Sequence, residues 1–385
     1  MVIYTSLANR PTIKVSDKVN FLNLQGSGGD IVCFIGKSPN TVTAPAIKKY
    51  YDYESVSKTT ADGGLVKDGD TSENNLLNVI HDFFEEVQPQ TSGDLGVPYI
   101  YAVDLGTSTI TADTIKSIIK LTATCKDITA VCFTDPITTD NMDVAVQADT
   151  EIKNNLSPKG QPRYVYFPAT KGLSDAELIK LTTDETKKIQ SDYICIIENI
   201  YYGKVVGKIA TTPYYVEPGR DAFRTIKAGT FTRRSDEQLT ALQNAGIIVC
   251  EDDPYRVDDN GEPLPVILIG VSTGFAATNK TTGCLLHARR NNNHQIREIM
   301  KILGTQLKEN ETIDALTKFK LSISNYLEAE EKANHIQDGY EFNVYERDVD
   351  PYNLVIDMTI AGVNATYLIE YNNEIGMPTA NVTGQ

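Results

Sequence analysis

Three short strings in the sequence carry residues that could bind a nucleotide or attack an ester. The first, residues 29–38, reads GDIVCFIGKS and ends in the Gly-Lys-Ser that closes a phosphate-binding loop. That loop needs a glycine five positions before Gly36, so that backbone N–H groups can wrap the phosphates ahead of a helix. Position 31 is isoleucine, and residues 31–35 form an apolar run of strand type. The string therefore predicts a buried strand that leaves through a turn.

The second string, residues 103–109, reads VDLGTST. It resembles the first phosphate loop of sugar-kinase and actin-like ATPases, in which Asp-x-Gly-Thr joins two antiparallel strands. Here Thr111 is placed to cap a helix, and isoleucines follow at helical spacing from Ile115. A matching later Asp-x-Gly loop is missing from the sequence. We therefore predict a β-to-α turn rather than an ATPase site.

The third string, GVSTG at 270–274, matches the nucleophile elbow of α/β hydrolases and follows an apolar strand. In those enzymes a helix starts directly after the serine, and an acid and a histidine follow along the chain. The formal partners of Ser272 are Asp314 and His335, which lie within or beside a long helical segment, and a polar connector follows the serine. A glycine-bounded bend between strands is favoured. A hydrolase using Ser272 stays open as the alternative, to be detected with a serine-directed fluorophosphonate.

Other residues capable of chemistry form no catalytic or metal-binding pattern. None of the four histidines shows metal-ligand spacing, and adjacent carboxylates such as Asp252-Asp253 are typical of solvated turns. We therefore expect a protein that is not an enzyme and that has no catalytic residues, no cofactor and no metal.

The bulk composition excludes several classes of partner and location. The formal net charge of −15 leaves no basic stripe for nucleic acid. No segment is apolar over a membrane-spanning length, and the first 15 residues lack the apolar run of a signal peptide, so no direct membrane insertion is expected. The six cysteines form no C-x-x-C pair, and four of them (Cys33, Cys132, Cys195 and Cys250) lie in apolar, strand-like runs. We therefore expect a protein folded in a reducing cytosol.

The elements around these strings alternate between strand and helix. An amphipathic helix is predicted over 72–87, with Ser72 as its N-cap. Strands are predicted at 98–103, 129–133, 163–167 and 193–198, with helices near 112–122, 140–155 and 174–190 between them. Such alternation predicts a parallel sheet covered by helices.

The last third of the chain differs from this pattern. Ser235 caps a short helix, a strand follows at 246–250, and Asn260-Gly261 marks a tight hairpin turn. Two long helices are predicted at 293–308 and about 312–333. Strand-like runs at 339–346, 353–360 and 363–371 end the chain.

Taken in order, these elements resemble the sheath subunit of a contractile tail, as in myophages, R-type pyocins and contractile injection systems. The strings that carry the resemblance are Cys33-Phe34-Ile35-Gly36 after an N-terminal arm, His81-Asp82-Phe83-Phe84 at the end of the amphipathic helix, the string NAGIIVCEDD at 244–253, and an arginine-bearing run at 285–290, interpreted as a strand before a helix. The chain departs from the family at 268–273, where a Trp-Gly-Ala-Arg-Thr-like string is replaced by LIGVST, and it has no tryptophan.

The resemblance implies a domain layout. We expect an α/β and α+β fold, with a central α/β domain whose parallel sheet is flanked by helices. The predicted divisions are an N-terminal arm at 1–20, a β-rich region with one amphipathic helix at 21–95, an α/β middle domain at 96–234, a C-terminal α+β sheath domain at 235–362 and a C-terminal arm at 363–385.

The resemblance also implies partners and a mechanism. Sheath subunits stack as hexameric rings around an inner tail-tube protein, meet baseplate and tail-terminator proteins, and contract to drive the tube through a cell envelope. They assemble in the host cytoplasm and become part of a virion tail or an extracellular phage-tail-like particle. Another self-assembling surface or pilus-type protein is the further alternative, disfavoured by the absent signal peptide and the unpaired cysteines.

Two sets of residues receive roles from this resemblance. The arms would donate strands to neighbouring subunits through residues of β-branched and aromatic type, namely Ile3, Tyr4, Ile13, Val15, Tyr367, Leu368 and Ile369. The two long helices would face the tube, which predicts tube contacts at Arg297, Lys301 and Lys308.

Overall fold

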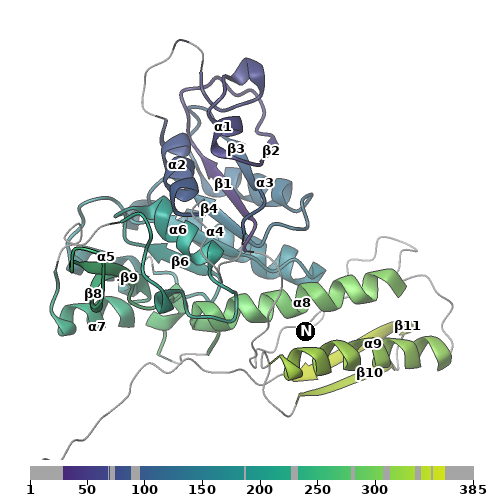
Figure 1. The fold of residues 1–385 in the computed structure, drawn as a ribbon. Coiled ribbons are helices and arrows are strands. Elements are labelled where there is room, and N and C mark those ends of the chain that lie inside the picture. The colour runs from purple at the N-terminus through teal and green to yellow at the C-terminus, as the bar shows by residue number, and fades with distance from the viewer. Residues whose placement is uncertain are drawn as a thin grey trace, which may run out of the picture.

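The computed structural model describes residues 29–67, 69, 74–87, 96–185, 188–226, 233–278, 282–306, 313–333, 340–347 and 350–359. Its centre is a seven-stranded sheet in the order β2-β3-β1-β4-β5-β6-β7 (Figure 1). The strands are β1 (Val32–Gly36), β2 (Ile47–Tyr50), β3 (Ile100–Asp104), β4 (Ala130–Phe133), β5 (Tyr164–Pro168), β6 (Ile194–Ile197) and β7 (Ile247–Ile248). All neighbours pair in parallel except β2, which runs antiparallel to β3 at one edge.

Helices cover both faces of the sheet, as the alternating sequence predicts. One face packs against α2 (Asn75–Val87) and α6 (Tyr202–Thr211). The other packs against α3 (Ala112–Thr122), α4 (Met142–Glu151), α5 (Asp175–Thr183) and α7 (Asp236–Asn244). The short helix α1 (Tyr53–Val56) lies beyond β2. The α/β architecture is therefore confirmed.

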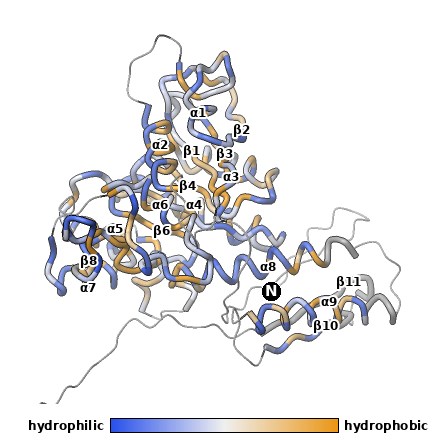
Figure 2. The backbone as a smooth tube through the Cα atoms, viewed as in Figure 1, coloured by the Kyte–Doolittle hydropathy of each residue, from blue (hydrophilic) through white to orange (hydrophobic). Residues whose placement is uncertain are grey.

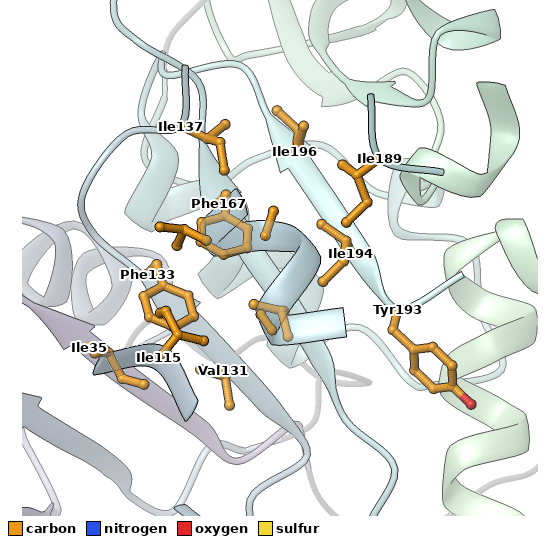
Figure 3. Packing of buried hydrophobic residues seen from close by; sticks show 14 of the residues in the cluster. Ile35, Ile115, Val131, Phe133, Ile137, Phe167, Ile189, Tyr193, Ile194 and Ile196 are labelled. Atoms are coloured by element: carbon orange, nitrogen blue, oxygen red, sulfur yellow. The ribbon is translucent and has the colours of Figure 1, made fainter. Parts of the chain in front are cut away.

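The central strands β1, β4, β5 and β6 are buried along their whole length because helices cover both of their sides, whereas the edge strand β2 carries two exposed lysines. Figure 3 shows one of the two cores, in which Phe133 and Phe167 from adjacent strands stack with ring centroids 4.7 Å apart. Cys33 is buried in this core as a small apolar residue, and Cys132, Cys195 and Cys250 are buried in the core on the other face of the sheet. All six cysteines are free thiols. Burial raises the pKa of Cys33 to about 12, so this thiol stays protonated and unreactive.

Predicted helix starts are mostly confirmed. The hydroxyls of Thr111 and Ser235 accept the N–H groups of Thr114 and Gln238 and cap α3 and α7. Ser72 lies outside the described residues, and the side chain of Asn74 caps α2 by accepting the N–H of Leu77 at 3.0 Å. The helix predicted over 174–190 is α5, and it ends earlier, at Thr183.

The predicted divisions at 95/96 and 234/235 both cut through the sheet. Strand β1 lies between β3 and β4, and β7 closes the sheet beside β6. A sequence pattern cannot show that an early strand inserts between two later ones, because the pairing is made by contacts distant along the chain. Residues from 32 to 248 thus build one layered unit.

The run 285–290, predicted as a strand, is the first part of a helix. Helix α8 spans Leu286–Gln306, and only Leu285 makes an isolated bridge, to Val271. The strand was expected only from the resemblance, whereas long-range contacts bury the polar residues of this run on a helix. The polar residues of α8 with at most 2 % exposure are His287, Arg289, Arg290, Asn291 and Gln295.

These polar side chains attach α8 to the amino-terminal edge of the sheet. Arg290 Nε donates to Asp30 Oδ2 at 2.9 Å, just before β1. Arg289 Nη2 donates to Asp192 Oδ2 at 3.1 Å, just before β6. Arg297 Nη2 donates to the carbonyls of Ile128 and Pro162 at 2.5 and 2.6 Å, before β4 and β5. One helix thus links the starts of four parallel strands.

The remaining elements form two smaller units. Strands β8 (Cys250–Val257) and β9 (Pro263–Ile267) make an antiparallel hairpin, which confirms the turn predicted at Asn260-Gly261. Helix α8 leads to α9 (Ile313–Lys332) and to the antiparallel pair β10 (Glu341–Arg347) and β11 (Asp350–Thr359) (Figure 1). Figure 2 shows hydrophobic residues gathered along the central sheet and hydrophilic ones along much of α8.

Replacing Arg290 with methionine should destabilise the protein strongly. The substitution leaves the carboxylate of Asp30 buried without its cation, and such a loss costs about 3–5 kcal/mol. The measurement is urea unfolding followed by circular dichroism. The control is Lys301→Met on the same helix, whose side chain is 72 % exposed and which should change stability little. Equal midpoints for the two variants would contradict this attachment of α8.

Candidate functional site

The two nucleotide-like strings lie side by side and bind one another. Strands β1 and β3 are parallel neighbours, with Gly36 opposite Asp104. Ser38 Oγ donates to Asp104 Oδ1 at 2.7 Å, and Asn40 Nδ2 donates to Oδ2 at 2.6 Å. The N–H of Gly106 also donates to Oδ1, at 2.7 Å. The groups that would hold a nucleotide are therefore used to fix two turns to each other.

The turn after β3 has the β-to-α geometry predicted from its sequence. Gly106 has a φ of +57°, and a Cβ there would lie 2.6 Å from the carbonyl oxygen of Asn40. Only glycine allows both this backbone conformation and this close approach. The loop then enters α3 at its Thr111 cap.

The sheet has a switch point, the usual place for a ligand in a doubly wound fold. The neighbours of β1 are β3 on one side and β4 on the other, and the chain crosses from β3 past β1 to β4. Ligands bind outside the carboxyl ends of strands at such a point. Here the ammonium of Lys37 lies 3.4 Å from Asp135 Oδ1, and Asn75 Nδ2 donates to the carbonyl of Thr134 at 2.7 Å. A Cβ on Gly36 would collide with Thr134. These contacts tie together the turns at the carboxyl ends of β1 and β4.

A small cavity lies beside the turn after β4. Its volume is about 20 Å³, and it is lined by Ile110, Phe133, Asp135, Pro136, Ile137, Asn141, Val144 and Phe167. That space suits one water molecule, not a nucleotide. Burial raises the pKa of Asp135, although the nearby Lys37 opposes the shift.

The geometry around Ser272 does not support a nucleophile elbow. The side chain is 1 % exposed, and its Oγ donates to the carbonyl of Cys284 at 3.2 Å. A short 3₁₀ turn, Thr273–Ala276, follows it instead of an α-helix. His335 and the side chain of Asp314 lie outside the described residues. The bend predicted from GVSTG fits what is seen, and a buried hydroxyl cannot meet a substrate.

One group of potential metal ligands was missed by the sequence analysis. His81, Asp82 and Glu85 lie on one side of α2, with ligand atoms within 4.8 Å of one another. The spacing of His81 and Glu85, four residues apart in a helix, was the available signal. Lys204 Nζ lies 2.8 Å from Glu85 Oε2, so this carboxylate already has a cation. The group is accounted for as a surface ion-pair network.

The residues predicted to face a tube have different surroundings. Arg297 is 9 % exposed and donates to three carbonyls of its own chain, so its assignment to a surface is wrong. Burial and the neighbouring Arg163 lower the pKa of Arg297 to about 9. Lys301 is exposed and pairs with Glu298. Lys308 lies outside the described residues, as do all seven positions predicted to donate strands.

A titratable cluster lies where α9 packs on α8. Tyr326 OH donates to Gln295 Oε1 at 2.8 Å, and Tyr214 stacks on His294 with ring centroids 4.0 Å apart. Glu330 of α9 is half-buried here. Burial, together with the charge of Glu298, raises its pKa to about 7.

The packing of α9 on α8 should therefore weaken as the pH rises. The folded protein holds a proton on Glu330 up to about pH 7, whereas the unfolded chain releases it near 4.5, so stability falls between these values. Glu330→Gln, which resembles the protonated acid, should reduce this fall and raise the Tm at pH 8. The measurement is thermal unfolding at pH 5 and pH 8, with the exposed Glu328→Gln as control. A pH dependence unchanged by Glu330→Gln would contradict the role of this carboxyl.

Comparison with solved structures shows what the fold is similar to. A chain of the helical sheath of the anti-feeding prophage in its contracted state matches with a TM-score of 0.64 at 13% identity, over 97% of this chain and 100% of that chain. A chain of the six-fold symmetrised baseplate of the same particle matches with a TM-score of 0.64 at 12% identity, over 96% and 100%. A chain of its contracted-state baseplate gives 0.61 at 12% identity, over 98% and 100%.

No protein-family model and no curated protein matches the chain. The structural matches nevertheless extend over nearly the whole length of both chains, and the chain has the fold of contractile sheath-type proteins. The resemblance found in the sequence is thereby confirmed at the level of fold. Among the described residues, no helix is both long and apolar enough to cross a membrane.

Proposed function

We propose that this protein is the structural subunit of a contractile tail sheath. The observation that carries the proposal is the match to a helical sheath chain over 97% of this chain and all of the other. Subunits would stack as hexameric rings around an inner tube protein, between baseplate and tail-terminator proteins. The particle, assembled in a host cytoplasm, would be a virion tail or a phage-tail-like machine.

The contacts at the switch point of the sheet support a non-enzymatic role. At the switch point Lys37 pairs with Asp135, and the carboxylate of Asp104 accepts hydrogen bonds from Ser38 and Asn40. Contraction would then draw its work from additional surface buried between subunits, through rigid-body movement from an extended lattice to a shorter one. No nucleotide would be consumed.

The pair β10–β11 supports strand exchange between subunits. Among the described residues these strands form a two-stranded sheet by themselves, and such a sheet is marginally stable in water. The edge of a small sheet can accept an added strand through its backbone N–H and C=O groups. We propose that the arms of neighbouring subunits, at 1–20 and 363–385, supply those strands through Ile3, Tyr4, Ile13, Val15, Tyr367, Leu368 and Ile369.

Assembly is the direct test of this function. The concentrated, untagged protein should form tubes or stacked rings with sixfold end views in negative-stain electron microscopy. Deleting residues 1–20 should abolish them while the circular dichroism spectrum is retained, because the central sheet begins at Val32. Wild-type protein that stays monomeric at every concentration and salt would overturn the proposal.

Among the described residues, Lys301 remains a candidate for a tube contact, and Lys308 stays a prediction. Lys301 is exposed on α8, and a contact that must release during firing should be electrostatic. Lys301→Glu should therefore reduce co-sedimentation with the inner tube. Lys153→Glu is the matched control, since Lys153 is also exposed and pairs with a carboxylate within its own helical segment. Equal co-sedimentation of the two variants would remove Lys301 from the tube face.

A further inference from the structure

The β8–β9 hairpin holds one aromatic side chain away from the body of the protein. The strand register shifts between Asp253 and Val257, and within this bulge Tyr255 is 94 % exposed. Asp253 fixes the bulge: Oδ1 accepts the N–H of Tyr255 at 2.9 Å, and Oδ2 lies 3.2 Å from Arg256 Nε. Arg256 also donates to the carbonyl of Gly219 at 3.3 Å. Bulges of this kind re-aim side chains, and an ordered tyrosine is a frequent anchor of protein interfaces.

Several carboxylates lie on the same hairpin as this tyrosine. Asp259 and Glu262 are exposed at the hairpin end, and Glu251 lies near Asp236, Asp252 and Asp253. Burial and these three like charges raise the pKa of Glu251. The surface would therefore gain most from a partner that carries positive charge beside an aromatic face.

The chain has such a surface at β2. Lys48 and Lys49 are exposed on this edge strand, and Tyr51 is 65 % exposed just after it. Lys49 Nζ lies 3.2 Å from the ring centroid of Tyr99, whose ring meets that of Tyr51 edge-on at 5.9 Å. We name Lys49, Tyr51 and Tyr99 the lysine–tyrosine patch; Lys48, the preceding residue of the edge strand, borders it from the opposite face of β2.

The hairpin and the patch lie at opposite ends of one sheet. Strand β2 forms one edge, and the chain leaves the other edge, β7, directly into β8 (Figure 1). A single copy therefore cannot bring them together, whereas two copies arranged head to tail can. Such heterologous contacts repeat around a ring or along a helix. In a chain of net charge −15, an acidic surface meeting a second copy needs a local cationic partner of this kind.

We propose that the β8–β9 hairpin of one copy docks on the lysine–tyrosine patch of the next copy. This contact rests on the proposed sheath function and specifies one of its subunit interfaces. Tyr255 would pack against the rings of Tyr51 and Tyr99, and Asp259 and Glu262 would pair with Lys48 and Lys49.

A charge-exchange experiment on the full chain tests the contact. One variant carries Asp259→Lys and Glu262→Lys, and a second carries Lys48→Glu and Lys49→Glu. Each alone should reduce sedimentable assemblies roughly tenfold or more, about the loss of one central interface contact. An equimolar mixture should restore assembly, because each reversed surface then meets a complementary one. Lys116→Glu with Lys120→Glu, on exposed positions of α3, is the control with the same charge change.

The outcomes separate this contact from the proposed function. Tubes formed equally by wild type and both variants, or a mixture that fails to restore assembly, overturn the contact and leave the sheath proposal standing. Wild-type protein that never assembles overturns both. Tyr255→Ala should impair assembly and leave the circular dichroism spectrum unchanged. Equal loss of assembly in the α3 control would show a general effect of charge and would also overturn the contact.

Discussion

The structure depends on buried guanidinium groups that attach one helix to the starts of four parallel strands. The residues that begin β1, β4, β5 and β6 present carboxylates or carbonyls at one edge of the sheet, and Arg289, Arg290 and Arg297 satisfy them from a single helix. Buried charge is costly unless it is paired, so this arrangement tolerates little displacement. It joins the α/β layers to everything that follows α8.

Much of the α/β part could be predicted, since its elements are encoded locally. The apolar runs that became β3 to β6, and the caps at Thr111 and Ser235, carry their own signals. The burial of α8 could not be predicted, because Arg290 acquires its partner Asp30 only when residues 260 positions apart meet. The insertion of β1 between β3 and β4 could not be predicted for the same reason, because these strands are distant along the chain.

For the candidate sites, the sequence was enough to argue against the enzyme motifs. It could not predict the contacts that the residues of those motifs make instead. A missing glycine at position 31 was enough to reject a phosphate loop. That Ser38 and Asp104, from two rejected motifs, would bind each other follows only from the parallel pairing of β1 with β3. Arg297 was misplaced at a surface because a charged residue in a long helix is usually solvated.

Helix α8 also has a mechanical consequence. Its 21 residues give a length of about 30 Å, and its arginine contacts end at Arg297, so the final turns extend beyond the sheet toward α9. A helix held at one end acts as a lever. The nine residues beyond Arg297 add about 14 Å, so a rotation of about 10° at Arg297 would move the end of the helix by roughly 2 Å. A reorientation of the α/β layers would thus be passed along α8 toward α9, β10 and β11.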